Sequence, residues 1–206
     1  MNTEINLKTI EYAKHMTSMN MGIQPAHQIF YYYSILYTAE CSARAFSFYE
    51  HLLTFKDVDS IQLVGAVQEA IAHAGALAFY FWNNGSSRQP KEMKEYIKQR
   101  SDYLKNEFNL DETSALKNRS IRNTFEHFDE KIDIALLNTL AGTFYPMPVI
   151  QSHTTIEKEQ VGKYFKLLDI EEKCLVLLNQ KFFFEDIQKE VNKIYDIAKK
   201  KVQLHG

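Results

Sequence analysis

The chain has 206 residues, of which 45% are hydrophobic and 13% aromatic, with 7 glycines and 4 prolines; this composition excludes a disordered or low-complexity protein and predicts one well-packed domain. The 24 Lys and Arg residues nearly balance the 26 Asp and Glu residues. This balance excludes a protein that binds nucleic acid through an overall positive charge of the domain. Cys41 and Cys174 are too few for a disulfide framework and predict a reducing, cytoplasmic setting.

The N-terminal segment mixes charged with apolar residues, so no secretory signal is expected there. Two strongly apolar stretches, residues 29–49 and 63–82, are long enough to cross a bilayer. The first contains Glu40 and Arg44, and the second contains Glu69. Because a charge near the middle of a membrane span is costly, both stretches are expected to be buried helices, and no membrane association is predicted.

Pro25 predicts the first turn of a long helix, since its missing N–H would have no partner there in any case. A weak amphipathic pattern between Ile5 and Met16 indicates a short helix before it. The long helix is expected to end near Phe55 and is aromatic on nearly every face. Such a helix lies in the centre of a bundle or partly under another subunit.

Asp59 and Ser60 are capping residues, and they predict a second helix over about 61–82. One side of this helix is formed by small residues: Gly65, Ala66, Ala70, Ala74, Gly75 and Ala78. Because small side chains let helix axes approach closely, this side predicts a tight helix–helix contact.

Pro90 opens a third helix, mixed in charge, which is expected to end near Phe108. Asp111 is expected to cap a fourth helix that runs from about Glu112 to Leu140. The four helices predict an up-and-down bundle over about 25–140.

Pro146 and Pro148 end the helical pattern. Short apolar runs follow, and those at 164–168, 174–178 and 182–184 predict a small antiparallel β-meander before an amphipathic helix from Glu185 to Lys201. The predicted fold class is therefore mainly α, a single domain over 1–206. Residues 147–206 are expected to elaborate the bundle.

The fourth predicted helix has a polar side with residue types that could catalyse a reaction. Ile121, Phe125, Phe128 and Ile132 share its apolar side at about 100° per residue. The opposite side carries Arg122, Asn123, Glu126, His127, Glu130 and Asp133. Histidine can transfer a proton at neutral pH, and arginine can hold a phosphate with two parallel hydrogen bonds. A plain solvated face, with Glu126 paired to Arg122, remains the alternative interpretation.

The segment from Arg122 to His127 resembles the Arg-x(4–6)-His motif of HEPN-domain proteins, in which a polar residue such as Asn123 often follows the arginine. The motif lies late in a predicted helical bundle, as it does in that family. The likeness covers about 25–140 in helix order and six residues in detail. A second match, Arg44 to His51, has Ala45 after the arginine and lies in the early aromatic helix, so it fits less well.

This resemblance implies a metal-independent endoribonuclease without a cofactor, in which the motifs of two subunits meet in one cleft and cleave RNA to a cyclic phosphate. Arg122 would stabilise the phosphorane, and His127 would act as acid or base. Asn123 would orient the phosphate or His127, and Glu126 could tune His127. Arg119, with Lys117, would add local RNA contacts. A homodimer is therefore expected, and many such proteins are toxins with a cognate antitoxin or act in phage defence.

Three other interpretations remain open. Some members of the family are inactive, so the chain could be a non-catalytic module that binds a protein or a nucleotide. Glu69 and His73 lie one helical turn apart and could bind a metal, although a satisfied polar pair is the plainer explanation. Tyr31, Tyr32 and Tyr33 could stack on bases, but packing in the core or in a dimer is preferred.

The third helix also has a local basic stretch that could contact RNA. Its cations are Arg88, Lys91, Lys94, Lys98, Arg100 and Lys105. Acidic residues such as Glu92 and Asp102 are interspersed among them, so a solvated face is the preferred interpretation.

Overall fold

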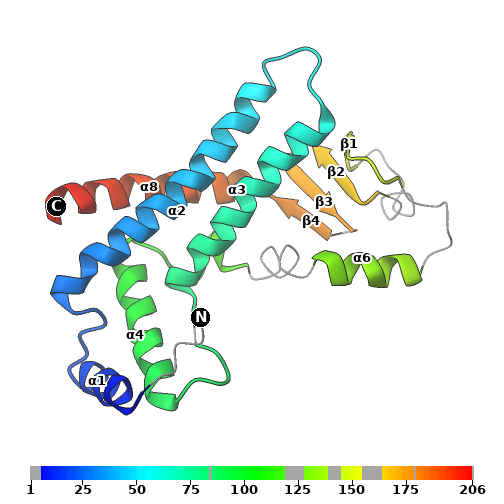
Figure 1. Cartoon of the computed structure of the whole chain (residues 1–206). Helices are drawn as coiled ribbons and strands as arrows, with labels where there is room; N and C mark the ends of the chain where they lie inside the picture. The colour runs from blue at the N-terminus through cyan, green and yellow to red at the C-terminus, as the bar shows by residue number, and fades with distance from the viewer. Residues whose placement is uncertain are drawn as a thin grey trace.

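The computed structural model of the chain describes residues 6–83, 85–118, 128–138, 145–154, 164–178 and 180–205. Its elements, in chain order, are α1 (Leu7–Ser18), α2 (Pro25–Leu52), α3 (Ser60–Phe81), α4 (Lys91–Glu107), the 3-10 turn η1 (Ala115–Lys117), α6 (Phe128–Leu137), β1 (Val149–Ile150), β2 (Lys166–Asp169), β3 (Cys174–Leu177), β4 (Gln180–Phe183) and α8 (Glu185–His205). Figure 1 shows α2 beside α3, α8 crossing α2, α1 and α4 at one end, and the sheet at the other. The predicted class, a helical bundle with a C-terminal meander and a terminal helix, is confirmed.

The central pair α2 and α3 begins as the sequence predicts. Pro25 occupies the first turn of α2. At the start of α3, the carboxylate of Asp59 accepts a hydrogen bond from the backbone N–H of Ile61 at 3.0 Å. This cap satisfies an amide that the helix itself leaves unpaired.

Small residues of α3 pack closely on α2, which confirms the predicted tight contact. Ala66, Ala70 and Ala74 are buried, and the hydroxyl of Ser42 donates a hydrogen bond to the carbonyl of Ala70 at 2.8 Å. A side-chain bond to a neighbouring helix backbone requires the axes to lie close together. Gly65 is different, because it lies on the exposed side of α3.

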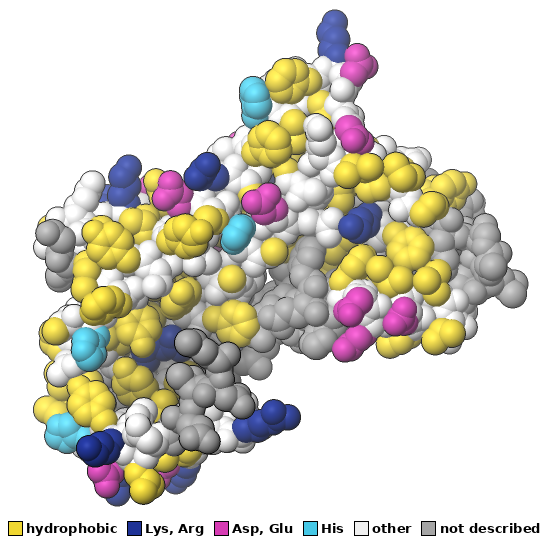
Figure 2. Space-filling model, viewed as in Figure 1, with side chains coloured by type: hydrophobic (Ala, Val, Ile, Leu, Met, Phe, Trp, Pro, Cys, Tyr) yellow, Lys and Arg dark blue, Asp and Glu magenta, His cyan; other side chains and the backbone are white. Residues whose placement is uncertain are grey.

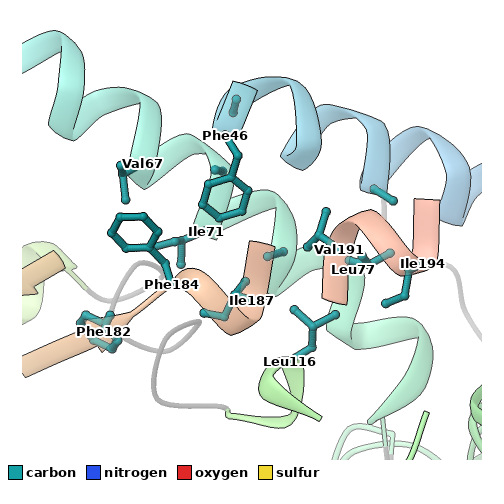
Figure 3. Packing of buried hydrophobic residues seen from close by; sticks show 14 of the residues in the cluster. Phe46, Val67, Ile71, Leu77, Leu116, Phe182, Phe184, Ile187, Val191 and Ile194 are labelled. Carbon is teal, nitrogen blue, oxygen red and sulfur yellow. The ribbon is translucent and has the colours of Figure 1, made fainter. Parts of the chain in front are cut away.

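Helix α8 is part of the bundle core rather than an elaboration outside it. The stacked rings of Phe46 and Phe184 have centroids 6.0 Å apart, and Tyr49 meets Phe184 edge-on at 5.6 Å. Figure 3 shows Phe184, Ile187, Val191 and Ile194 against residues of α2 and α3. The buried face of α8 is formed by Ile187, Val191, Ile194 and Ala198.

The sheet has the order β1-β2-β3-β4, and its last three strands form the predicted antiparallel meander. The first strand, β1, pairs parallel to β2, with Val149 opposite Leu167. One side of the sheet adds Leu168, Leu175, Leu177 and Phe182 to the main core, while the other side carries the smaller buried cluster of Leu167, Cys174 and Val176. The sheet therefore closes one end of the bundle.

The fourth predicted helix does not begin at Glu112. The carboxylate of Asp111 accepts hydrogen bonds from the backbone N–H of Thr113 at 2.8 Å and from its hydroxyl at 2.5 Å, which makes a turn. One turn of 3-10 helix, η1, follows. Between η1 and α6, residues 119–127 lie outside the described part of the chain.

Within the described ranges, α3 is long and apolar enough to cross a membrane by length and composition alone. Nine of its residues are buried inside the molecule, among them Val67, Ala70 and Ile71. Packing on α2 therefore accounts for its apolar character, as the sequence predicts for a core helix.

Candidate functional site

The five predicted site residues all fall within 119–127, outside the described residues: Arg119, Arg122, Asn123, Glu126 and His127. Their arrangement therefore remains a prediction. The structure does describe the chain on both sides, where η1 precedes the motif segment and α6 follows it. These two elements are the described parts of the chain that flank the motif in the sequence.

The end before the motif is fixed to α8 through one carboxylate. Glu190 accepts a hydrogen bond from the hydroxyl of Ser114 at 2.5 Å and from the backbone N–H of Leu116 at 3.3 Å. Leu116 is itself buried in the core. A buried anchor with a hydrogen-bonded backbone holds η1 in one position, so the motif segment starts from a rigid point.

A cleft of about 480 Å³ lies beside this anchor, between the end of α3, α4 and η1. Its lining brings together three lysines, two acids, two aromatic residues and a serine: Lys98, Lys105, Lys117, Asp102, Glu112, Phe81, Trp82 and Ser101. Lys117 stands two positions before Arg119 in the sequence. The cleft therefore adjoins the end from which the motif segment departs.

Ion pairs neutralise most of the charge in this cleft. Lys105 lies 2.9 Å from Asp102 and 3.3 Å from Glu112, and Lys117 lies 2.7 Å from Glu112. Hydrogen bonds from Lys117 and then from Lys105 hold the pKa of Glu112 below its usual range. Lys98 has no ion pair within the described residues, which leaves one surplus cation. That balance suits one phosphate group rather than a long polyanion.

The end after the motif is held at the sheet. Phe128 is half-buried against the core, and the ammonium group of Lys166 lies 5.4 Å from the centre of its ring. Lys166 also donates a hydrogen bond to Gln68 at 3.0 Å, and burial lowers the pKa of its ammonium group. Phe128 directly follows His127, so the second end of the motif segment is also anchored.

Helix α6 has the faces that the sequence predicts at four positions. Phe128 and Ile132 are half-buried, whereas Glu130 and Asp133 are exposed. At these four positions, the apolar and polar sides of α6 are therefore those that the sequence predicts.

The possible metal pair on α3 is loosely arranged. His73 Nε2 and Glu69 Oε1 are 4.0 Å apart, and both side chains are substantially exposed. No group of three or more His, Cys, Asp or Glu side chains placed to hold a metal occurs in the described ranges. The pair therefore resembles a surface contact across one helical turn.

The tyrosine run divides among three environments. Tyr32 is buried and donates a hydrogen bond to Glu107 at 3.2 Å. Tyr31 is half-buried, with the guanidinium of Arg100 over its ring at 5.6 Å, and Tyr33 is exposed. Two of the three tyrosines therefore pack inside the molecule instead of forming a stacking surface for bases.

The less favoured match to the motif, Arg44 to His51, lies on the outer side of α2. Both residues are exposed, and the ring of His51 meets Phe55 edge-on at 5.0 Å. The two residues belong to a surface that is described below.

Comparison of the chain with protein-family models, with curated proteins and with solved structures found no match.

The sequence missed the cleft as a site because its cations come from separate elements. Lys98 and Lys105 are two turns apart on α4, where the sequence indicates only a solvated face. Lys117 joins them from η1. The seven-residue spacing of Lys98 and Lys105 indicates that they share one side of α4. Their closeness to Lys117 depends on the turn at Asp111, which the sequence does not predict.

Proposed function

We propose that the chain is a metal-independent endoribonuclease of the HEPN type, acting at a site to which two copies contribute. The observation that carries the proposal is the motif from Arg122 to His127 in a mainly helical bundle. The anchoring of both neighbouring ends, by Leu116 and Phe128, supports it, because a catalytic segment needs rigid supports.

In this mechanism, His127 of one copy removes the proton from a ribose 2′-hydroxyl, and the 2′-oxygen attacks the adjacent phosphorus. The bond from phosphorus to the 5′-oxygen then breaks, and His127 of the other copy protonates that oxygen. Arg122 stabilises the charge on the phosphorane with two parallel hydrogen bonds, so no metal ion is required. Asn123 orients the phosphate or His127, and the products carry a 2′,3′-cyclic phosphate and a 5′-hydroxyl.

RNA contacts beyond the motif are local in this proposal. Arg119, Lys117 and the surplus cation Lys98 provide them at one end of the segment. Glu126 tunes His127 or pairs with Arg122. Because few phosphates are neutralised, RNA affinity should be modest and should depend only weakly on salt concentration. The cell would use such an enzyme in the cytoplasm as a toxin, held by an antitoxin, or as a phage-defence effector.

The test is cleavage of total RNA and of a defined oligonucleotide in EDTA. Arg122→Ala and His127→Ala should each abolish cleavage, and the product ends should be a cyclic phosphate and a hydroxyl. A substrate with a single 2′-deoxy nucleotide at the cleaved position should resist. Arg88→Ala and His15→Ala serve as matched controls, because both residues are exposed and lie in other parts of the chain.

Equal cleavage by the wild-type protein and by both motif variants would refute the assignment. The absence of cleavage in the wild-type protein would favour the alternative function, a non-catalytic module that binds a protein or a nucleotide. One observation favours that alternative: α2 carries an exposed aromatic face of the kind used for binding. The module would be tolerated on overexpression, whereas an active toxin would arrest growth.

A further inference from the structure

The outer side of α2 and the turn after it carry aromatic side chains that the described residues leave exposed. Five rings are at least half exposed: Phe30 (69%), Tyr33 (53%), Tyr37 (70%), Phe48 (51%) and Phe55 (55%). Figure 2 shows hydrophobic side chains gathered along α2 on this side of the molecule. Single exposed aromatic residues are ordinary, but a row along one helix marks an interaction surface.

The row has the periodicity of a helix–helix seam. Most of its residues repeat every seven positions in two lines: Phe30, Tyr37, Arg44 and His51, and Cys41 and Phe48, the second continued by Phe55 in the turn after α2. Tyr33 lies outside both lines. A seven-residue repeat keeps one face of a helix against a second helix along its whole length. Helix α2 already packs on α3 and α8 with its other sides, so the outward face is suited to a helix from outside the chain.

The charges at the middle of the row indicate which helix fits. Glu40 and Arg44 lie between the two aromatic groups, one turn apart, and neither forms an ion pair within the described residues. An antiparallel second copy of α2 places its Arg44 opposite Glu40 and its Glu40 opposite Arg44. A parallel copy would instead oppose like charges, which is unfavourable. The row is therefore complementary to itself in one orientation.

The aromatic groups match in that same orientation. An antiparallel copy would bring Phe30 near Phe55 of the second copy, in the turn after its α2, and Tyr37 near Phe48 of the second copy. Beside Phe48, a hollow of about 530 Å³ opens between α2 and α3, lined by Cys41, Arg44, Ala45, Ser47, Phe48 and Glu69. The hollow provides room for an incoming aromatic ring.

Gly65 on the adjoining face of α3 is an independent sign that this side is covered. A methyl group added to it would meet nothing within 4 Å among the described residues, so their packing does not require a glycine there. Glycine inside a helix costs about 1 kcal/mol relative to alanine. Close approach of another chain would give this residue a role.

The exposed area agrees with a stable dimer. The five rings expose on the order of 600 Å² per copy, taking about 200 Å² for a fully exposed aromatic side chain. Ile61 and Leu53 extend the same region and are also exposed. A standard interface buries about 800 Å² per partner, and its centre is enriched in aromatic residues.

We propose that α2 and the adjoining face of α3 form the interface of a symmetric homodimer, in which two α2 helices lie antiparallel with Glu40 and Arg44 paired across the symmetry axis. A two-fold arrangement uses one patch on both copies, as this self-complementary row requires. The inference deepens the proposed function, because a composite site needs two copies, but it rests on observations that do not involve the motif.

The first test is the mass of the purified chain by light scattering over a range of concentrations. The wild-type protein should have the mass of two chains. Tyr37→Asp and Phe48→Asp should each weaken the dimer by roughly 30-fold, the usual effect of losing a central interface residue. Leu137→Asp is the matched control, since Leu137 is exposed on α6, away from this face, and its substitution should leave the dimer intact.

The second test exchanges the central charges. Arg44→Glu and Glu40→Arg should each weaken the dimer, because like charges then meet across the axis. The chain carrying both substitutions should dimerise like the wild-type protein. Because Glu40 and Arg44 are both exposed, circular dichroism should show unchanged helix content in every variant.

The third test fixes the orientation by cross-linking in a Cys41→Ser background, where Cys174 is buried. Ser34→Cys and His51→Cys chains should cross-link with each other when mixed. Neither should cross-link with itself, because the identical positions lie about 26 Å apart along antiparallel helices.

A monomeric wild-type protein, a dimer that is indifferent to Tyr37→Asp and Phe48→Asp, or cross-linking of each cysteine variant with itself would overturn the inference. The outcomes separate it from the proposed function. A dimeric protein that does not cleave RNA would support the interface and refute the proposed enzymatic activity. A monomeric protein that cleaves RNA would refute the interface and support the activity.

Discussion

The ring of His153 lies within hydrogen-bond distance of the Asp169 carboxylate, with 2.7 Å between Nδ1 and Oδ2, and both side chains are buried. The same carboxylate oxygen accepts the backbone N–H of His153 at 2.8 Å, and the other oxygen accepts the N–H of Glu172 at 3.0 Å. One carboxylate therefore joins the loop after β1 to the turn between β2 and β3.

Asp169→Asn should lower the free energy of unfolding by about 3 kcal/mol, because a buried group that gathers several donors loses its charge and gains donors of its own. Urea denaturation followed by circular dichroism measures the change. Asp133→Asn, at an exposed position of α6, is the control and should change stability little. Equal effects of the two substitutions would show that Asp169 does not hold these loops.

The stability of the protein should depend on pH through the same carboxylate, that of Asp169. Although burial favours its neutral form, hydrogen bonds from the backbone of Glu172 and His153 and from the His153 ring hold the pKa of Asp169 below its usual value. A depressed folded pKa stabilises the protein above the unfolded pKa of about 3.9, and that contribution is lost as the pH falls through the folded pKa. The difference in unfolding free energy between the wild-type protein and Asp169→Asn should be constant above pH ~5 and should shrink below pH ~4. A difference that grew in acid would contradict this assignment.

Two buried tyrosines should respond to loss of the hydroxyl with opposite signs. The hydroxyl of Tyr49 is buried and has no hydrogen-bond partner in the described structure, and burial raises its pKa to about 12. Tyr49→Phe should therefore stabilise the protein by about 1 kcal/mol. Tyr32→Phe should destabilise it by about 2 kcal/mol, because Tyr32 donates to the carboxylate of Glu107. Thermal and urea unfolding of both variants check the prediction, and destabilisation by Tyr49→Phe would point to an ordered partner for that hydroxyl.

The cleft beside η1 offers a test by RNA binding, which rests on the proposed function. Glu112→Gln removes the acid that pairs with Lys105 and Lys117, so RNA affinity should rise several-fold at low salt. Lys117→Ala should weaken binding and reduce the slope of log K against log salt by about 1, the effect of one lost phosphate contact. Lys91→Ala is the control, since Lys91 does not line the cleft. Identical salt slopes for all three variants would place RNA elsewhere.

The sequence predicts much of the bundle because its helices carry local signals. Pro25, Asp59 and Pro90 mark helix starts that the structure confirms to within a residue. The small residues of α3 likewise predict its close packing on α2. These features depend on neighbours in the sequence, which is why periodicity and capping reveal them.

The features that the sequence does not predict depend on contacts between residues far apart in the chain. An amphipathic pattern shows that α8 buries one face, but it does not show that this face packs on α2. Nor does it show that Phe184, directly before α8, meets Phe46 and Tyr49. The turn at Asp111 replaces a helix because Leu116 is drawn into the core and Glu190 of α8 pairs with η1. The two-residue strand β1 is too short for a pattern, and its parallel pairing with β2 joins residues 18 positions apart, as between Val149 and Leu167.

The place of α8 also has a consequence for how the protein is made. The side-chain amide of Gln188 on α8 donates to the carboxylate of Glu50 on α2 at 2.8 Å across 138 residues of chain. At synthesis rates of about 5–20 residues per second, α2 leaves the ribosome on the order of ten seconds before the helix that completes its core. During that interval the inner rings of α2, Phe46 and Tyr49 among them, lack the cover of Phe184 and of α8, which follows it. Nascent chains should therefore be most prone to aggregation just before the last helix emerges, and a chaperone that shields α2 in this window should raise the yield of folded protein.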